Sequence, residues 1–532
     1  MKRAMGKPAE AVDGRLACAC ALSVFVVVFL AFSRSLDGEF INWDDFGLVV
    51  QNRNLGFSAE NLRWMFTSSY HGTYQPIGWL SLSLDQVFWG LDPFGFHLTA
   101  NLLHALAAAL LFYWARDLAT YLRPQQSVRW QLLGAVTVAL LFALHPLRVE
   151  NISWISQRRD QLAGLFTVIG LLFYHRAVLK FPDQKIPFRC LAPTLTSLLL
   201  ACLSKPSAVT IVAVLCVLDL YVYQRFSSLS PWQRIWRSGL EKYPIWLVSL
   251  GMGVVAVFSA KYAASSMMPF SVYGIEPRLA LSCLSLVLML KLIFFPIGLY
   301  PLVELRFMPS FSQGPELVSL IILGVITLGL GWRKKRLPFL WAAWLIYLGT
   351  SLPTAGIFTA GQQIVADRYG YFPNLPWATL LGLSVLYLPG EHHGPLRWGW
   401  VILTAGMITG LAALCWRQQA IWRNAETLWT RTVVSDPYNY PAHLYLAGTL
   451  VLKNRESEAI SLLMKATRLR EEAPDAWFDL GKIELGAGRH GHAVIAFRKT
   501  LEVAPAHREA ARLLKDALLN LEKQKNQKNG EN

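Results

Sequence analysis

The sequence predicts an all-α protein that combines a polytopic membrane domain with a C-terminal repeat domain. Apolar runs of about 15 to 20 residues recur from residue 16 to residue 416, and each can span a hydrocarbon core of roughly 30 Å. Only 16% of the 532 residues are charged, whereas soluble domains carry roughly a quarter. We therefore expect about 11 to 13 spans in residues 1–417, a repeat domain in residues 418–522 and a disordered tail in residues 523–532.

The net charge of +16 has a membrane explanation. The basic residues cluster in short loops between apolar runs, as the positive-inside rule requires, so nucleic-acid binding is not needed to account for them. Arg3, Lys7 and Arg15 place the N-terminus in the cytoplasm. The first apolar run is interpreted as an uncleaved span, because no small-residue cleavage site follows it. The seven cysteines lie in or beside apolar runs without a CxxC motif, so neither a disulfide framework nor a zinc site is indicated.

The spans predict which loops face outward. The first span, residues 16–33, delivers "NWDD" to the outer face, and a long aromatic loop follows it. The next spans, flanked by basic loops, place "HPLRVENISWISQRRD" (145–160) and "SKPS" (204–207) on the same face.

The crossing count is ambiguous near residues 279–298. Two apolar runs precede "RKKR" (333–336), and two full crossings would put this basic cluster outside. The first of these runs contains Lys291 and ends in "FFPIGLYP", so we expect it to stop short of crossing or to form a re-entrant pair. "VADRYGYFPNLP" (365–376) then lies outside, and the last span carries the repeats outside. A plain count of twelve crossings predicts the opposite.

The C-terminal region has a period of 34 residues. Ala425, Ala459 and Ala493 show it, and so do Trp429, Leu463 and Phe497. Small residues where two helices touch, with large apolar residues between them, are typical of tetratricopeptide repeats. We expect half a repeat, two full repeats and a final polar helix. Such a stack offers a concave face for a partner or substrate, although it can also serve only to pack on the membrane domain.

Ionisable residues gather on the predicted outer face. Such residues in a membrane domain indicate function by default. The set comprises Asp44, Asp45, Tyr74, Gln75, His145, Arg148, Glu150, Arg158, Arg159, Asp160, Lys205, Asp367, Arg368 and Tyr369. Each has a plainer explanation: the aspartate pair can be solvated loop residues, the arginines can bind lipid headgroups, and Lys205 can snorkel.

Carboxylates and cations together suit one kind of chemistry. A carboxylate can take the proton from an attacking hydroxyl, and Arg or Lys can neutralise a departing phosphate. A lipid-phosphate sugar donor would hold its phosphate at this depth. His97 and His104 lie seven residues apart on one helix face, but no further His or Cys stands at ligand spacing, so packing or hydrogen bonding is favoured over metal.

Five motifs in fixed order resemble a known family. "NWDD", "YQPIGWLSLSLDQVFWGLDPFGFHLTANLLHAL", "LHPLRVENISWISQRRDQLAGLF", "LSKPSAVT" and "ADRYGYFPNLP" resemble the transmembrane and tetratricopeptide-repeat O-mannosyltransferases and their bacterial relatives, within the type C glycosyltransferases. The resemblance covers nearly the whole chain. Fewer repeats than the eukaryotic members carry favour a bacterial relative.

The resemblance implies a polyprenyl-phosphate-sugar donor, with mannose as one candidate sugar, and a protein or envelope-glycan acceptor. It implies that Asp44 and Asp45 form the acidic catalytic motif of the first outer loop, in which one of them, by preference Asp44, acts as the general base. Donor binding would fall to Arg158, Arg159, Asp160, Lys205, Asp367, Arg368 and Tyr369. We expect an inverting reaction without a cofactor, in a bacterial inner membrane with periplasmic repeats.

Two other classes of protein remain as alternatives. A non-enzymatic scaffold would recruit partners through its repeats, but it needs only one or two spans. A transporter would carry its charges at mid-membrane depth, whereas most of these lie at span ends.

Overall fold

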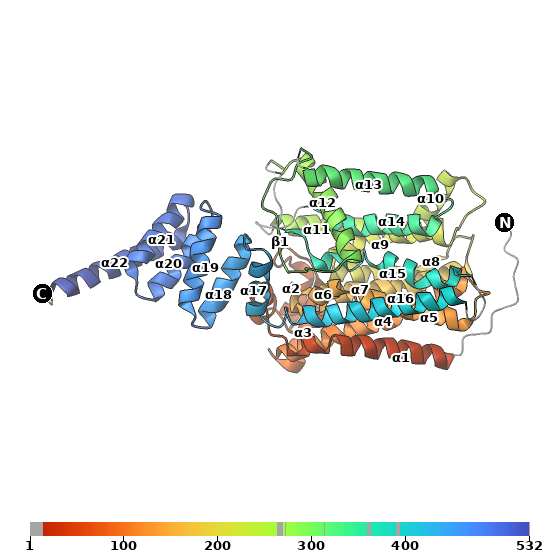
Figure 1. Ribbon diagram of the computed structural model, residues 1–532, viewed down its shortest axis with the longest axis horizontal. Coiled ribbons are helices and arrows are strands. Elements are labelled where there is room, and N and C mark those ends of the chain that lie inside the picture. The colour runs from red at the N-terminus through yellow and green to blue at the C-terminus, as the bar shows by residue number, and fades with distance from the viewer. Residues whose placement is uncertain are drawn as a thin grey trace. The chain divides into compact units, whose positions relative to one another are not determined.

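The computed structural model describes residues 14–262, 270–271, 273–312, 314–358, 363–389 and 394–530. The basic residues Arg3 and Lys7 lie outside them. Contacts divide the chain into two compact units: the first contains residues 1–40 and 44–423, and the second contains residues 41–43 and 424–532. Almost every element in both units is a helix, which confirms the predicted all-α class (Figure 1).

The first unit is a helical bundle with one small two-stranded sheet. Its α-helices and strands are α1 (Gly14–Ala31), α2 (Ala59–Thr67), α3 (Pro76–Trp89), α4 (Pro93–Leu122), α5 (Val128–Ala143), α6 (Val149–Ser153), α7 (Arg158–Lys180), α8 (Phe188–Ser204), α9 (Ile211–Val217), α10 (Pro231–Glu241), α11 (Tyr243–Tyr262), α12 (Ile275–Phe294), β1 (Val303–Glu304), α13 (Gly314–Arg333), α14 (Pro338–Ser351), β2 (Gln363–Val365), α15 (Leu375–Leu383) and α16 (Pro395–Gln419).

Within the described residues, seven helices are long and apolar enough to cross a membrane, and a bent pair at Val128–Ser153 can supply an eighth. This is fewer than the 11 to 13 predicted. Shorter apolar helices make up part of the difference, among them Phe188–Ser204, Pro206–Val222 and Leu375–Tyr387. At 1.5 Å per residue such helices measure roughly 20 to 26 Å, so apolar runs in the sequence need not each become a full-length span.

Hydrogen bonds join both ends of helix α12 to other segments of the first unit. Near its start, the Glu276 carboxylate accepts a hydrogen bond of 2.7 Å from the amide of Phe311, just before α13 begins. Near its finish, the carbonyl of Ile293 lies 2.9 Å from Nε2 of His145, which follows the last turn of α5. Beyond it, β1 pairs with β2, which follows α14. Helix α12 is long and apolar enough to cross a membrane, so the expected non-crossing or re-entrant segment at residues 279–298 stays a prediction.

Helix α16 finishes at the end of the bundle where α1 finishes. The guanidinium of Arg34 donates a hydrogen bond of 3.2 Å to the carbonyl of Trp416. The amide of Ser35 donates one of 3.1 Å to the Gln419 side chain. The indoles of Trp154 and Trp422 stack with centroids 5.8 Å apart. The chain therefore leaves the first unit at the end that carries the loop after α1.

The second unit contains the predicted repeat helices: α17 (Ala425–Ser435), α18 (Tyr440–Leu452), α19 (Glu456–Leu469), α20 (Pro474–Gly486), α21 (His490–Val503) and α22 (Arg508–Gly530). Both sets of residues spaced by 34 are buried, as a helix-packing role requires. A Cβ at Gly481 would lie 2.6 Å from the Phe497 ring, so α20 and α21 can pack this closely only with glycine there. The α22 helix continues to Gly530, where the sequence analysis expects a disordered tail from residue 523.

Candidate active site

The two adjacent aspartates have different environments. Asp45 is fully buried, and both the amide (2.9 Å) and the hydroxyl of Ser156 donate hydrogen bonds to its Oδ1. Asp44 is half-buried, and its carbonyl accepts the amide of Leu48 at 2.8 Å, which begins the next helical turn. Within the described residues, no hydrogen bond involves the Asp44 carboxylate. Asp44 therefore keeps free acceptor oxygens while Asp45 is held in place.

Glu150 and Arg368 form a buried ion pair beside this loop. Glu150 lies in α6, and Arg368 lies in the 3-10 helix η8 (Asp367–Gly370) that follows β2. The Arg368 amide donates a 2.9 Å hydrogen bond to Glu150, and the guanidinium pairs with the same carboxylate. The guanidinium also lies 5.3 Å above the Trp154 ring. Burial alone would lower the pKa of Arg368, but Glu150, Tyr369 and Asp44 together raise it above its ordinary value. Arg368 is thus a fixed cation within the electrostatic reach of Asp44.

Asp367, next in the chain, is also buried, and its Oδ2 has no hydrogen-bond partner in the described part of the chain. Burial raises the pKa of this carboxyl well above its ordinary value, the charge of Glu150 raises it further, and Arg368 opposes the shift. A protonated Asp367 has an O–H to donate, so it can act as a hydrogen-bond donor beside Arg368.

Arg158 is anchored to the protein. It pairs with Asp85 of α3 at 2.6 Å, and it donates hydrogen bonds to the Ser81 hydroxyl (2.9 Å) and the Phe96 carbonyl (2.7 Å). Only 1% of its side chain is exposed. Through these contacts Arg158 joins α7 to α3 and α4, while its Nε is buried without a hydrogen-bond partner in the described residues. The donor-binding role expected from the sequence stays a prediction.

Arg159 differs from Arg158 in its lack of an ion-pair partner within the described residues. It is half-buried, its Nε is buried without a hydrogen-bond partner, and no ion pair involves it among the described residues. Asp160, the next residue, is fully buried and pairs with Lys205, whose side chain is 14% exposed. The sequence Arg158-Arg159-Asp160 thus supplies one structural cation, one uncommitted cation and one carboxylate that fixes Lys205.

The remaining predicted residues make contacts with neighbouring segments. His145 contacts Ile293, as described above, and Arg148 is buried against the Phe142 and Gly370 carbonyls. The Tyr74 hydroxyl donates to the Phe66 carbonyl at 3.1 Å. Gln75 is buried just before α3, and Tyr369 packs against the apolar cluster around Trp344. The Arg148 Nη1 and Gln75 Oε1 atoms are buried without a hydrogen-bond partner in the described residues, and the functional roles expected for these five residues stay predictions.

Some residues of the site were not predicted from the sequence. Asp45 is held by Ser156, and Arg368 is held by Gln363 and Trp154. The residue types of these three partners gave no signal in the sequence. Asp85 did leave a signal, because it interrupts an apolar helix, and a charge in such a place needs a partner. Its partners are Arg158 and the hydroxyl of Thr99 at 2.6 Å.

Among the described residues, no group of three or more His, Cys, Asp or Glu side chains could hold a metal ion. His104 makes hydrogen-bond contacts instead, with its Nε2 3.1 Å from the Ala143 carbonyl.

The repeat unit has a groove of its own, with a volume of about 940 Å³, lined by residues of α19, α20 and α21. Met464, Trp477 and Ile495 give it apolar surface, while Arg468 and Glu471 add charges of both signs. A mixed groove of this kind suits a polypeptide segment better than a small apolar ligand.

Comparisons with known proteins agree with the sequence motifs. The chain is 25% identical over 514 residues to Protein O-mannosyl-transferase TMTC1 of Homo sapiens, which covers 85% of this chain and 55% of that protein. It is 23% identical to human Protein O-mannosyl-transferase TMTC4, covering 82% of this chain and 65% of the relative. The chain thus spans between about half and two thirds of these relatives. No protein-family model matches it. The chain is a multi-pass membrane protein related to the TMTC protein O-mannosyl-transferases, as its motifs predict.

Proposed function

We propose that this protein is an inverting glycosyltransferase that moves a sugar from a polyprenyl-phosphate carrier to a hydroxyl of a protein or envelope glycan. One observation carries the proposal. Asp44 presents a half-buried carboxylate without a hydrogen bond in the described chain, beside an aspartate that is locked in place and a cation that is fixed by Glu150. The relatives' printed activity, O-mannosyl transfer, supports mannose as the first sugar to test.

In the proposed reaction, Asp44 takes the proton of the acceptor hydroxyl while the hydroxyl oxygen attacks the anomeric carbon. The bond from that carbon to the phosphate oxygen breaks, and the lipid phosphate leaves with both electrons. A general base of this kind contributes roughly 10²- to 10⁴-fold. Asp45 orients the loop through Ser156 and takes no proton. A phosphate is a good leaving group once its charge is matched by cations, so neither a second catalytic carboxylate nor a metal cofactor is required.

The leaving phosphate would be bound by Arg159 and Lys205, with Arg368 close to the sugar. Arg159 has no ion pair within the described residues, and Lys205 is part-exposed beside Asp160. Arg can bind phosphate through two parallel hydrogen bonds, while Lys acts as a point charge. Asp367, when protonated, has an O–H to offer to a sugar hydroxyl. Arg158 is omitted from this set because its ion pair with Asp85 already matches its charge.

The acceptor would be recruited by the groove on the repeats. Its mixture of apolar and charged residues favours a polypeptide acceptor. The proposed location is a bacterial inner membrane with a cytoplasmic N-terminus, which follows the distribution of basic loops. The Asp44 site and the repeats would then both lie in the periplasm.

The experiment is an assay of the purified full-length chain with polyprenyl-phosphate mannose and a panel of extracted periplasmic proteins, with other polyprenyl-phosphate hexoses in parallel. Mass spectrometry identifies any added hexose and its site. The proposal expects transfer by the wild type and loss of transfer by Asp44→Asn. If no polyprenyl-phosphate sugar is consumed while the protein captures specific partners through its repeats, the scaffold alternative is correct.

A further inference from the structure

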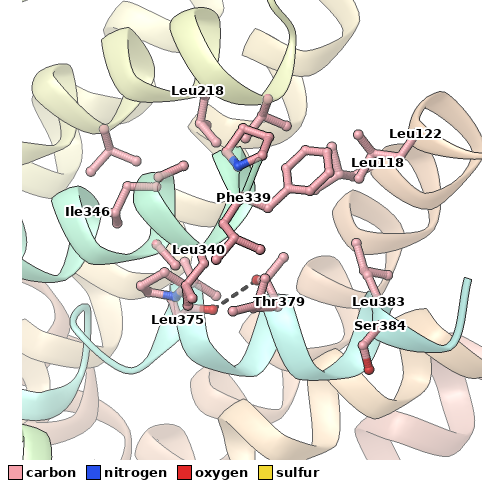
Figure 2. Close-up of a pocket in the computed structure, with 18 of the residues that line it drawn as sticks. Leu118, Leu122, Leu218, Phe339, Leu340, Ile346, Leu375, Thr379, Leu383 and Ser384 are labelled. Atoms are coloured by element: carbon pink, nitrogen blue, oxygen red, sulfur yellow. Dashed lines mark hydrogen bonds between the residues drawn. The ribbon is translucent and has the colours of Figure 1, made fainter. Parts of the chain in front are cut away.

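An apolar cavity of about 580 Å³ opens between helices of the first unit, well within the roughly 300 to 1,000 Å³ range of ligand pockets. Its wall is formed by the last turns of α4, by η6 (Leu218–Val222) and by residues of α14 and α15. Figure 2 shows Leu118 of α4 and the adjacent Phe339 and Leu340 of α14 projecting toward its interior.

The Thr379 and Ser384 hydroxyl groups in the wall donate to backbone carbonyls. Thr379 donates to the Leu375 carbonyl at 2.8 Å, which is the dashed line in Figure 2. Ser384 donates to the Leu381 carbonyl at 2.7 Å. The cavity therefore offers hydrocarbon surface and no free hydroxyl donor from these two residues, so it is suited to an alkyl chain.

The cavity lies far from the aspartate pair. The carbonyl of Phe96, near the start of α4, accepts the hydrogen bond from Arg158 at the candidate active site. Leu118, which lines the cavity, lies 22 residues further along the same continuous helix. At 1.5 Å per residue the separation is roughly 33 Å, about the thickness of the hydrocarbon core. The cavity and the active site therefore belong to opposite leaflets.

Cations stand at the edge of the cavity. Lys335 and Arg336, in the turn between α13 and α14, are its charged lining residues in the described chain, and both are exposed. No ion pair or side-chain hydrogen bond involves either of them within the described residues. A third cation, Arg123, lies 4.1 Å above the ring of Tyr387, another lining residue. A site with an alkyl-chain interior and an uncompensated basic edge is complementary to a lipid that carries a negative headgroup.

We propose that this cavity binds an anionic phospholipid from the leaflet opposite the active site, with one acyl chain in the apolar interior and the phosphate against Lys335 and Arg336. The charge at the edge selects this occupant over a neutral lipid. The distance selects it over the sugar donor, whose phosphate would lie at the Asp44 end of the bundle. The inference does not depend on the proposed transferase activity.

The test uses full-length protein, stripped of lipid in detergent and reconstituted into nanodiscs of phosphatidylcholine with a minor fraction of phosphatidylglycerol. Native mass spectrometry then counts each lipid that stays bound. The wild type should retain one phosphatidylglycerol in preference to phosphatidylcholine. The double variant Lys335→Ala/Arg336→Ala should lose this preference by roughly tenfold or more, because two cations near the headgroup are removed.

The matched control is Arg333→Ala/Lys334→Ala, which removes the same charge from the same basic cluster but from residues that do not line the cavity. It should keep the preference. Thr379→Phe, which fills the interior, should reduce retention of the acyl chain; if it fails to fold, the exposed double variant still decides. Equal loss in the control, or no loss in Lys335→Ala/Arg336→Ala, would overturn the proposal. So would displacement of phosphatidylglycerol by equimolar polyprenyl phosphate, which would assign the cavity to the donor's tail.

Discussion

Ser156 donates two hydrogen bonds to one carboxylate oxygen of Asp45, although the two residues lie 111 positions apart in the chain. This contact ties the loop after α1 to the segment between α6 and α7. It leaves Asp44, the adjacent residue, as the carboxylate of the pair with unused acceptor oxygens in the described structure. The two aspartates should therefore respond differently to the same substitution.

Asp44→Asn should reduce transfer by roughly 10²- to 10⁴-fold, because an amide cannot accept the acceptor's proton. The free energy of unfolding should stay close to that of the wild type, since the side chain is half-buried and makes no hydrogen bond within the described residues. The measurements are kcat with the identified donor and the melting temperature in detergent. Full activity in purified Asp44→Asn would refute the assignment of Asp44 as the base.

Asp45→Asn should lower stability by about 1 to 3 kcal/mol, because it weakens hydrogen bonds to a buried charged acceptor. Ser156→Ala removes the hydroxyl donor but keeps the amide donor, so we expect a smaller loss in the same direction. Thermal unfolding of both variants beside Asp44→Asn checks the order. Equal melting temperatures for all three would mean that the Asp45–Ser156 contact contributes no stability.

Arg158→Ala and Arg159→Ala form a matched pair at adjacent positions. Arg158→Ala leaves Asp85 buried without its partner, which should cost about 3 to 5 kcal/mol and reduce expression. Arg159→Ala should keep the fold and reduce kcat/KM for the lipid-linked donor by roughly 10- to 100-fold, the effect of one charge-assisted hydrogen bond. Donor titrations and expression levels distinguish the two. Unchanged donor kinetics in Arg159→Ala would leave that arginine as a headgroup contact.

Asp367 should make stability depend on pH. The pKa of this carboxyl is higher in the folded state than its ordinary value of 3.8, so the folded state binds more protons above that pH. The stabilisation of the folded state by this carboxyl is fully present when the pH is below its ordinary pKa of 3.8. This stabilisation is lost as the pH rises through the raised pKa of the folded state. Asp367→Asn should therefore flatten the decline of melting temperature with rising pH. The exposed carboxylate variant Asp37→Asn should leave the slope unchanged, and identical slopes for all three proteins would contradict the shift.

The path of α12 can be tested with reporters. If α12 does not cross, as the basic cluster "RKKR" predicts, α13 alone carries the chain from the outer face to Arg336. A periplasm-active reporter fused after Arg423 should be active, since α16 finishes at the Asp44 end of the first unit, and one fused after Arg336 should be silent. The reverse pattern, with activity after Arg336 and none after Arg423, would mean that α12 crosses the membrane.

The sequence alone determined the helical class, the repeats and the location of the acidic loop. These follow from local regularities: an apolar run needs helical backbone hydrogen bonding in lipid, and a period of 34 residues places Ala459 and Leu463 at the same packing positions as Ala493 and Phe497. The candidate aspartates were identifiable because charge beside a first span is unusual.

Only the tertiary structure decided what each charged residue does. Arg158 and Arg159 are identical in type and adjacent in sequence, but successive helical positions differ by about 100° and therefore face different neighbours. One meets Asp85 of α3, and the other meets no ion-pair partner in the described chain. The same holds for Asp44 and Asp45, of which Ser156 holds only the second. Composition and spacing record which groups a chain carries, whereas partners distant in sequence fix which of those groups remain free to act.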